Sequence, residues 1–168
     1  ELSNKEATLD IIMDAPLVYK TGTDSVYSDI GYMLLGLIIE KVTNSSLDNY
    51  VQNEIYKPLG LKHITYKPLQ NNFKRSDCAA TEIGLAKRSI WKEEFSKSET
   101  GVLQGIVHDG NAYFAMNQVS GHAGVFANAE SIAVLAQVIL NGGGYGEVKL
   151  FDGSTTDMFT SQQGMWET

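Results

Sequence analysis

Tyr27–Thr43 reads YSDIGYMLLGLIIEKVT, and it joins a short polar triplet directly to a run of apolar residues. One set of apolar side chains recurs at intervals of three and four residues, namely Ile30, Met33, Leu34, Leu37 and Ile38. That spacing predicts an amphipathic α-helix. Because further apolar residues cover the flanks of this face, we expect the helix to lie inside a hydrophobic core.

The polar triplet is a candidate catalytic site. Tyr27 and Ser28 stand where the helix begins. There the first backbone N–H groups lack intrahelical partners and the helix dipole favours negative charge, so a phenolate would be stabilised. A purely structural role fits the same residues, with Ser28 or Asp29 as the N-cap and Tyr27 as a hydrophobic staple. The residues alone leave both interpretations open.

The longer stretch YSDIGYMLLGLIIEKVTNSSLDNYVQNEIYKPLGL resembles the second conserved block of the superfamily of serine β-lactamases, penicillin-binding proteins and esterases. It is most similar to the class C-like branch, in which a Tyr-x-Asn triplet opens this helix and the tyrosine works with a lysine to activate a nucleophilic serine. The resemblance implies that Tyr27 is catalytic and that Asp29, at the Asn position, contacts substrate. An ionised carboxylate can accept hydrogen bonds but cannot donate them, so Asp29 cannot donate the hydrogen bond that an asparagine amide would.

Two further stretches, ATEIGLAKRSIW and GIVHDGNAYFAMNQVSGHAGVFANAESIAVLAQVILNGG, are similar to a narrower branch. That branch includes secreted esterase-like enzymes and the β-lactamase-like domain attached to some bacterial family-three glycoside hydrolases. Within it, VHDGNA makes His108 a second candidate for substrate binding, although an imidazole that only orders the loop would give the same pattern. A zinc site from His108, Asp109 and His122 is conceivable, but their spacing matches no familiar motif, so we expect neither a metal nor a cofactor.

The superfamily needs two more elements, a Ser-x-x-Lys before the tyrosine and a Lys-Thr-Gly or His-x-Gly after it. The chain only imitates them. Ser89–Lys92 follows the tyrosine and lies in a charged stretch, and Lys20–Gly22 precedes it where a turn is expected. His122–Gly124 lies in a loop-like stretch before the expected strand. We therefore expect both true elements outside the chain, and no activity from the chain alone, because covalent catalysis fails without its nucleophile.

The fold class expected from these patterns is mainly α, with or without a short hairpin. We interpret residues 1–168 as a single partial domain, the helical subdomain of the α+β fold of the β-lactamase-like superfamily. A core shaped to pack against other parts would expose an apolar surface, which predicts self-association of the isolated chain.

Composition bounds the function further. Net charge is −7, which disfavours nucleic acid as a partner, and 43% of the residues are hydrophobic, as in a globular protein. The single cysteine, Cys78, excludes an intrachain disulfide. No apolar run approaches the roughly 20 residues of a membrane span. The resemblance implies a periplasmic or other extracytoplasmic location and a small-molecule or peptidoglycan-derived substrate. The alternative function is a non-catalytic cell-wall sensing or scaffolding module with the same fold.

Other helices are predicted from residues that cap or interrupt a helix. Ser3–Glu6 forms a capping box before a first helix, and Asn128 caps a later one. We expect the inward face of that later helix to carry Ile132, Leu135, Ala136 and Ile139. Residues 61–82 have mixed polarity and predict a meandering surface segment, and a final helix begins near Ser154.

Overall fold

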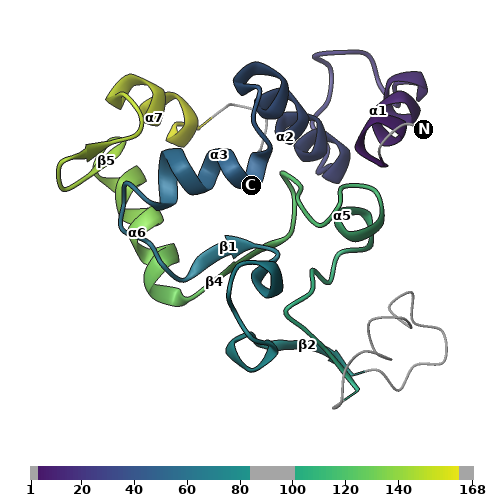
Figure 1. Ribbon diagram of the computed structural model, residues 1–168. Coiled ribbons are helices and arrows are strands. Elements are labelled where there is room, and N and C mark those ends of the chain that lie inside the picture. The colour runs from purple at the N-terminus through teal and green to yellow at the C-terminus, as the bar shows by residue number, and fades with distance from the viewer. Residues whose placement is uncertain (1–3, 84–100, 163–168) are drawn as a thin grey trace. The chain divides into compact units, whose positions relative to one another are not determined.

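The computed structural model describes residues 4–83 and 101–162 (Figure 1). The chain forms two compact units, each assembled from separate stretches of sequence. The first unit comprises Glu1–Pro16, Ser28–Asn49 and Thr65–Phe126. The second comprises Leu17–Tyr27, Tyr50–Ile64 and Ala127–Thr168.

Helices in the first unit are α1 (Asn4–Asp14), α2 (Asp29–Thr43) and the short α5 (Gly110–Phe114). Helix α3 (Leu47–Val51) runs across the boundary between the units and continues into a π-helical turn, η1 (Gln52–Tyr56). Two 3₁₀ turns, η2 (Pro68–Gln70) and η3 (Arg75–Asp77), follow later in the chain.

Strands in the described residues are short and pair two by two. They are β1 (Ile64–Tyr66) with β4 (Val125–Ala127), β2 (Ala80–Ile83) with β3 (Val102–Gln104), and β5 (Gly144–Tyr145) with β6 (Val148–Lys149). The β2–β3 and β5–β6 pairs are antiparallel. Among the described strands, β5 and β6 form a short hairpin of the predicted kind. The β1–β4 and β2–β3 pairs were not predicted, because they join strands far apart in sequence, which local turn signals do not reveal.

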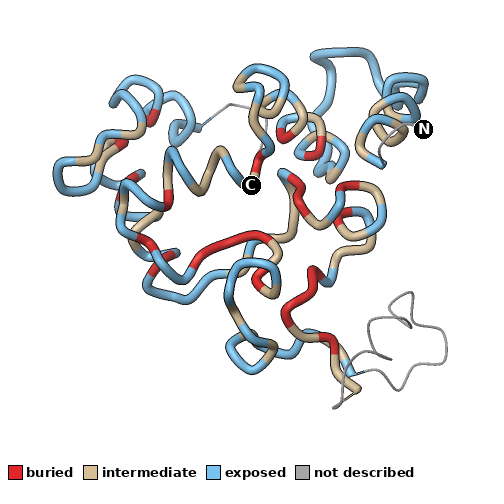
Figure 2. The backbone as a smooth tube through the Cα atoms, viewed as in Figure 1, coloured by how far each residue is buried: buried red, intermediate tan, exposed pale blue. Residues whose placement is uncertain are grey.

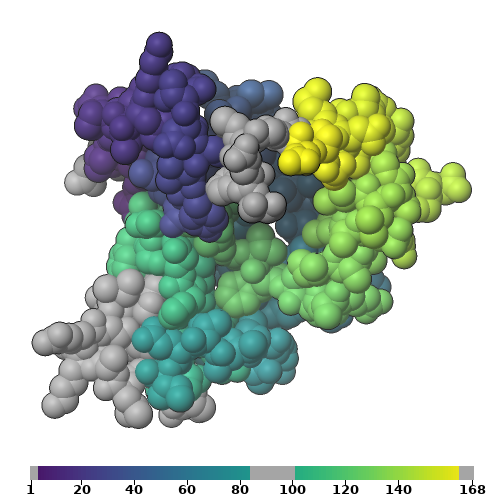
Figure 3. All heavy atoms as spheres, turned by 180° about the vertical axis from the view of Figure 1, so that it is seen from behind, coloured from purple at the N-terminus to yellow at the C-terminus, as the bar shows by residue number. Residues whose placement is uncertain are grey.

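The second unit contains α6 (Ala129–Leu140) and α7 (Gly153–Thr160). In Figure 3 the yellow atoms of α7 lie against the light-green atoms of the segment that follows α6. Gly143 packs closely against the chain just before α7: its φ is +105°, and a Cβ on it would lie 2.2 Å from the carbonyl oxygen of Phe151. Only glycine fits this position.

Helix α2 begins and ends where its sequence predicts. The Ser28 hydroxyl accepts a 3.1 Å hydrogen bond from the Gly31 N–H, which makes Ser28 the N-cap, and Asn44 ends the helix in the left-handed conformation with φ 50°. The capping interpretation of Ser28 is therefore confirmed.

Burial of α2 differs from the prediction. Only Met33 and Gly36 are buried. Five large apolar side chains of this helix are at least 50% exposed, namely Ile30, Tyr32, Leu35, Ile38 and Val42. One side of the helix is covered because Gly36 packs on the backbone of Gly121 and on Leu47. Within this chain α2 is thus half covered, and its exposed side is an apolar surface of the kind predicted.

Residues 61–82 are more buried than predicted. Figure 2 shows a continuous buried stretch in β1, where Ile64, Thr65 and Tyr66 are 3%, 8% and 6% exposed. The prediction of a surface segment was wrong for β1, because polar residues on either side of this short strand dilute its apolar character in a sequence window. Residues 69–82 are exposed or partly exposed, as predicted.

The two units have separate apolar clusters. In the first, Leu103 and Ile106 pack with Leu69 and Tyr113. In the second, a buried cluster of three residues is lined by partly buried neighbours that include Val134 and Leu135 of α6; the three are Tyr56, Leu61 and Ile64.

The inward face of α6 also differs from its prediction. Ser131 and Val138 are buried, whereas Ile132, Ala136 and Ile139 are exposed. Leu135 does pack against the cluster. The helix is therefore rotated relative to the expected face, because apolar residues occupy nearly its whole circumference and the sequence does not fix which side is covered. The predicted N-cap is confirmed, since Asn128 accepts a 2.9 Å hydrogen bond from the Ser131 N–H.

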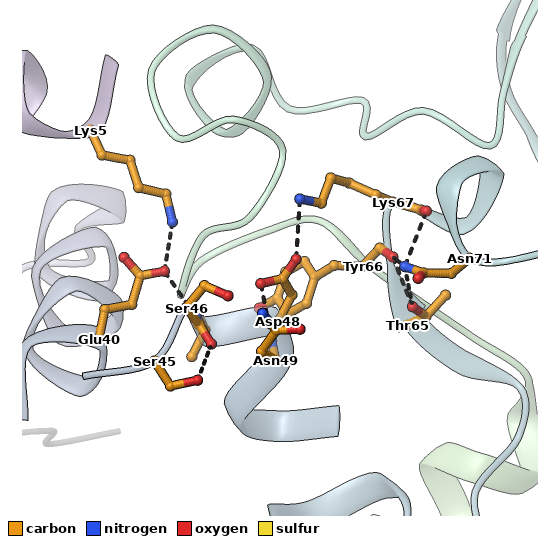
Figure 4. A network of polar contacts seen from close by, with 11 residues as sticks. Lys5, Glu40, Ser45, Ser46, Asp48, Asn49, Thr65, Tyr66, Lys67 and Asn71 are labelled. Atoms are coloured by element: carbon orange, nitrogen blue, oxygen red, sulfur yellow. Dashed lines mark hydrogen bonds and ion pairs between the residues drawn. The ribbon is translucent and has the colours of Figure 1, made fainter. Parts of the chain in front are cut away.

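A polar network ties together distant stretches of the first unit (Figure 4). Lys5 Nζ lies 2.7 Å from Glu40 Oε1, which also accepts a 2.8 Å hydrogen bond from the Leu47 N–H. Lys67 Nζ lies 3.1 Å from Asp48 Oδ2. These pairs join α1 to α2, and the start of α3 to the chain after β1.

No helix in the described part of the chain is long and apolar enough to cross a membrane. Cys78 is half-buried and forms no disulfide among these residues. Burial, and secondly the nearby Asp77 carboxylate, raise the pKa of its thiol. A thiol that resists ionisation is a poor nucleophile, which agrees with a packing role.

Candidate functional site

The first unit gathers Asp29, Asp109 and His122 in one cluster. Asp29 is the first residue of α2, Asp109 immediately precedes α5, and His122 lies in the loop before β4. One carboxylate oxygen from each aspartate and one ring nitrogen of the histidine lie within 4.8 Å of one another. The fold therefore brings together three polar groups that are far apart in the sequence.

His122 is the central and most enclosed member of the cluster, with its side chain 5% exposed. Its Nε2 lies 2.9 Å from Asp109 Oδ1, and its Nδ1 lies 2.7 Å from Ser120 Oγ. Ser120 is itself 1% exposed, and its carbonyl oxygen accepts a 2.8 Å hydrogen bond from the Tyr66 hydroxyl. The imidazole is thus held from both sides, and its Nε2 faces the Asp109 carboxylate.

Asp109 is held as the N-cap of α5. Its Oδ1 accepts a 2.7 Å hydrogen bond from the Ala112 N–H as well as facing His122. Burial alone would raise the pKa of the Asp109 carboxyl, but the hydrogen bond from Ala112 and the interactions with His122 outweigh burial and lower it. Asp109 is therefore a carboxylate at neutral pH.

Asp29 differs from Asp109 in having its carboxylate uncommitted. Within the described residues it has no hydrogen-bond or ion-pair partner, because the capping role is taken by Ser28. Its side chain is available to a ligand while its backbone is fixed by the first turn of α2.

The close approach of α2 to the loop of residues 120–122 sets the position of the cluster. A Cβ on Gly121 would lie 2.1 Å from the Tyr32 carbonyl oxygen, and a Cβ on Gly36 would lie 3.1 Å from the Gly121 nitrogen. The two backbones therefore touch without side chains between them. This contact fixes the helix that carries Asp29 against the loop that carries His122.

The structure places the predicted site residues as follows. Tyr27 precedes α2 and is 85% exposed. Asp29 joins the cluster. His108 lies outside it: its Nε2 is 3.1 Å from Glu82 Oε2, on an exposed surface. Of the three residues considered for zinc, Asp109 and His122 do come together, with Asp29 in place of His108.

Sequence reasoning considered Asp109 and His122 but did not select either as a site residue. Their signal was present, since both lie in glycine-punctuated stretches, HDG and SGHAG, of the kind that often line sites. Nothing in their spacing, however, links them to Asp29, because the contact depends on how the loop folds back on α2.

The imitation motifs have structural explanations where they are described. Gly22 has a φ of +78°, and the Thr23 N–H donates to the Lys20 carbonyl oxygen at 3.1 Å, so Lys20–Gly22 forms the predicted turn. His122–Gly124 lies in a loop, where Gly124 has a φ of +110° and a Cβ on it would lie 2.6 Å from the Gln118 carbonyl oxygen. Ser89–Lys92 falls outside the described residues.

The Beta-lactamase family model matches residues 1–164. The chain therefore belongs to the β-lactamase family, and the resemblance to serine β-lactamases and penicillin-binding proteins is confirmed.

Two curated relatives show how much of a longer protein this chain resembles. An N-acetylmuramyl-L-alanine amidase of Bacillus subtilis is 49% identical over 158 residues, which cover 94% of this chain and 35% of that protein. A putative D-alanyl-D-alanine carboxypeptidase of Escherichia coli is 48% identical over 159 residues, covering 94% and 36%. The chain thus spans about a third of the length of these relatives.

Solved structures agree on the fold. A penicillin-binding protein from Bacillus halodurans superposes with a TM-score of 0.65 at 18% identity, covering 97% of this chain and 42% of that one. An octameric penicillin-binding protein homologue from Pyrococcus abyssi gives 0.62 at 22% identity, covering 91% and 29%. At such identities the likeness concerns the fold alone.

Proposed function

We propose that the natural protein containing this chain is a serine hydrolase of the β-lactamase family, which acts through an acyl-enzyme on an amide, lactam or ester. The observation that carries the proposal is the 49% and 48% identity, across nearly the whole chain, to relatives named as an amidase and a putative carboxypeptidase. Because both names refer to cell-wall amide bonds, a peptidoglycan-derived peptide is the proposed substrate and an extracytoplasmic compartment the proposed location.

Within that mechanism Tyr27 is the proposed proton-transfer residue. Ser28 N-caps α2 and so takes the structural role that otherwise competes for the triplet, while the Tyr27 side chain stays exposed to a reacting partner. The nucleophilic serine and the lysine would come from sequence outside this chain. Positioned acid–base groups contribute roughly 10²- to 10⁴-fold to rate.

The test is Tyr27→Phe in the natural protein, assayed on a D-alanyl-D-alanine peptide and on an N-acetylmuramyl-L-alanine amide. We expect kcat to fall about 10²-fold or more with folding unchanged. Tyr32→Phe is the matched control, because it removes the same hydroxyl from another exposed tyrosine, in the first turn of α2. Equal turnover in wild type and Tyr27→Phe would refute the role of Tyr27.

The chain alone is proposed to be inactive and prone to self-association. The exposed apolar side of α2 would pack against the remainder of the parent domain, and without that cover two copies would bury it against each other. Light scattering of the isolated chain should show association that Leu35→Gln together with Ile38→Gln reduces. A monodisperse monomer with no change in the double variant contradicts this.

A non-catalytic sensing or scaffolding module is the second candidate, favoured by one observation, the aspartate at position 29 where the family pattern has asparagine. Covalent labelling of the natural protein separates the two. A fluorescent penicillin or a fluorophosphonate should label it if the serine hydrolase proposal is right, and absence of labelling by both would favour the sensing module.

A further inference from the structure

We propose that Asp29, Asp109 and His122 bind a divalent transition-metal ion, with Zn²⁺ as the best match. Their three donor atoms, two carboxylate oxygens and one imidazole nitrogen, lie within 4.8 Å of one another. Zinc is bound by histidine nitrogen and by aspartate oxygen, and zinc sites with three protein ligands keep a further position for water or substrate. The inference does not depend on the proposed hydrolase function.

The surroundings of His122 support a ligand role. Its Nδ1 is engaged by the Ser120 hydroxyl at 2.7 Å, and Ser120 is buried and held in turn by Tyr66. A metal-binding histidine commonly uses its second ring nitrogen for such a contact, which fixes the tautomer and the ring orientation. The remaining nitrogen, Nε2, faces Asp109.

The two carboxylates supply the charge that a cation neutralises. Within the described residues, no lysine or arginine pairs with Asp29 or with Asp109. Like charges this close repel each other unless a positive group lies between them. Asp29, which has no other described partner, is the ligand that a metal-free hydrogen-bond network leaves unexplained.

The backbone around the cluster is rigid enough to hold three ligands in place. The Gly36–Gly121 contact fixes α2 against the loop of His122, and the Ala112 N–H fixes the Asp109 carboxylate. Supported ligands of this kind are what a site needs, since loosely held ones do not keep a coordination geometry. Asp29 would then serve as a metal ligand rather than as a replacement for the asparagine of the family pattern.

The experiment is equilibrium dialysis of the natural protein against low-micromolar ZnCl₂, followed by metal quantification, with Co²⁺ as a spectroscopic probe. We expect one tightly held Zn²⁺ per chain and visible Co²⁺ absorption bands. Asp29→Asn and His122→Gln should each weaken zinc binding by at least ~10-fold and abolish the Co²⁺ bands. His63→Gln is the matched control for adventitious surface binding, because His63 is exposed and outside the cluster.

Asp29→Asn is the decisive variant, because it removes no described hydrogen bond and should leave the circular dichroism spectrum unchanged. If wild type retains no zinc, or if Asp29→Asn binds zinc as tightly as wild type, the cluster is a metal-free hydrogen-bond network and the proposal is wrong.

Discussion

Helices α2 and α6 begin in the same way but have different roles in the fold. Each follows a side-chain N-cap, Ser28 or Asn128, and each is apolar on nearly every face. The head of α2 meets a histidine and an aspartate from a distant loop through a backbone contact at Gly121, whereas α6 packs against an apolar cluster through Val134 and Leu135. Equal local signals thus give one helix that positions a polar cluster and one that builds a core.

Gly121→Ala should disrupt the contact between α2 and the loop of His122, and we expect it to have the largest effect on stability. The added Cβ would lie 2.1 Å from the Tyr32 carbonyl oxygen, so the loop or the helix must move. Overpacking against backbone predicts a loss of about 3 kcal/mol in the free energy of unfolding. Gly31→Ala is the control in urea denaturation: its Cβ meets only Ser28 atoms at 3.8 Å, and it should stabilise α2 by up to about 1 kcal/mol. Similar losses in both variants would contradict the role of the contact.

Val138→Ala should weaken the packing of α6, and we expect it to have the next largest effect on stability. Val138 is 1% exposed, and removing its buried methyl groups should cost about 2 kcal/mol in the free energy of unfolding. Its neighbour Ile139 is 47% exposed, so Ile139→Ala should cost clearly less although it removes more atoms. The reverse order in thermal or urea unfolding would restore the face predicted from sequence.

The two N-caps should prove equivalent in stability. Ser28→Ala and Asn128→Ala each remove one side-chain acceptor, and each should cost about 1 kcal/mol in the free energy of unfolding. Glycine at either position should cost only a few tenths. Only Ser28→Ala should also weaken zinc binding, since Asp29 is the next residue. A loss of zinc affinity in Asn128→Ala would contradict the idea that Ser28 affects zinc binding through the neighbouring Asp29.

The smallest expected effect is on the pH dependence of unfolding, in which two ion pairs should differ: Lys67–Asp48 in the first unit and Lys149–Asp152 in the second. Burial alone would raise the pKa of Asp48, but hydrogen bonds from Ser46 and Lys67, with the charge of Lys67, lower it below the ordinary value near 3.9. A lowered folded-state pKa adds stability above the ordinary value, and that stability is lost as pH falls through the folded-state value. We therefore expect Lys67→Met to destabilise by less than about 1 kcal/mol at pH 7, and by less still once the pH falls below the lowered folded-state pKa of Asp48.

The comparison pair is Lys149 and Asp152, 2.7 Å apart but exposed. The hydrogen bond and charge of Lys149 lower the pKa of Asp152, yet water screens a pair at this exposure. Lys149→Met should leave the pH dependence of unfolding unchanged. A pH-dependent loss in Lys149→Met as large as that in Lys67→Met would show that burial does not decide the difference.

Much of the local structure was predictable from sequence. The bounds of α2, the caps at Ser28 and Asn128, and the turn at Gly22 depend on residues within a few positions of each other, whose geometry is set by backbone sterics and short hydrogen bonds. The family was predictable too, because the block beginning at Tyr27 is long and specific.

Burial was less predictable. Ile64–Tyr66 turned out to be buried, and α6 turned out to cover a different face, because both depend on which distant segment packs against them. When a helix is apolar on every face, its sequence does not predict which face its neighbours will cover.

The sequence by itself therefore determined the family, the apolar helix headed by the tyrosine triplet, and the caps that begin its helices. Only the tertiary structure decided that Asp29 meets Asp109 and His122 and that His108 pairs with Glu82 instead. The physical reason is the glycine contact between α2 and the loop before β4: it is made by backbone atoms of residues far apart in the chain, and the periodicity and spacing of side chains do not encode it.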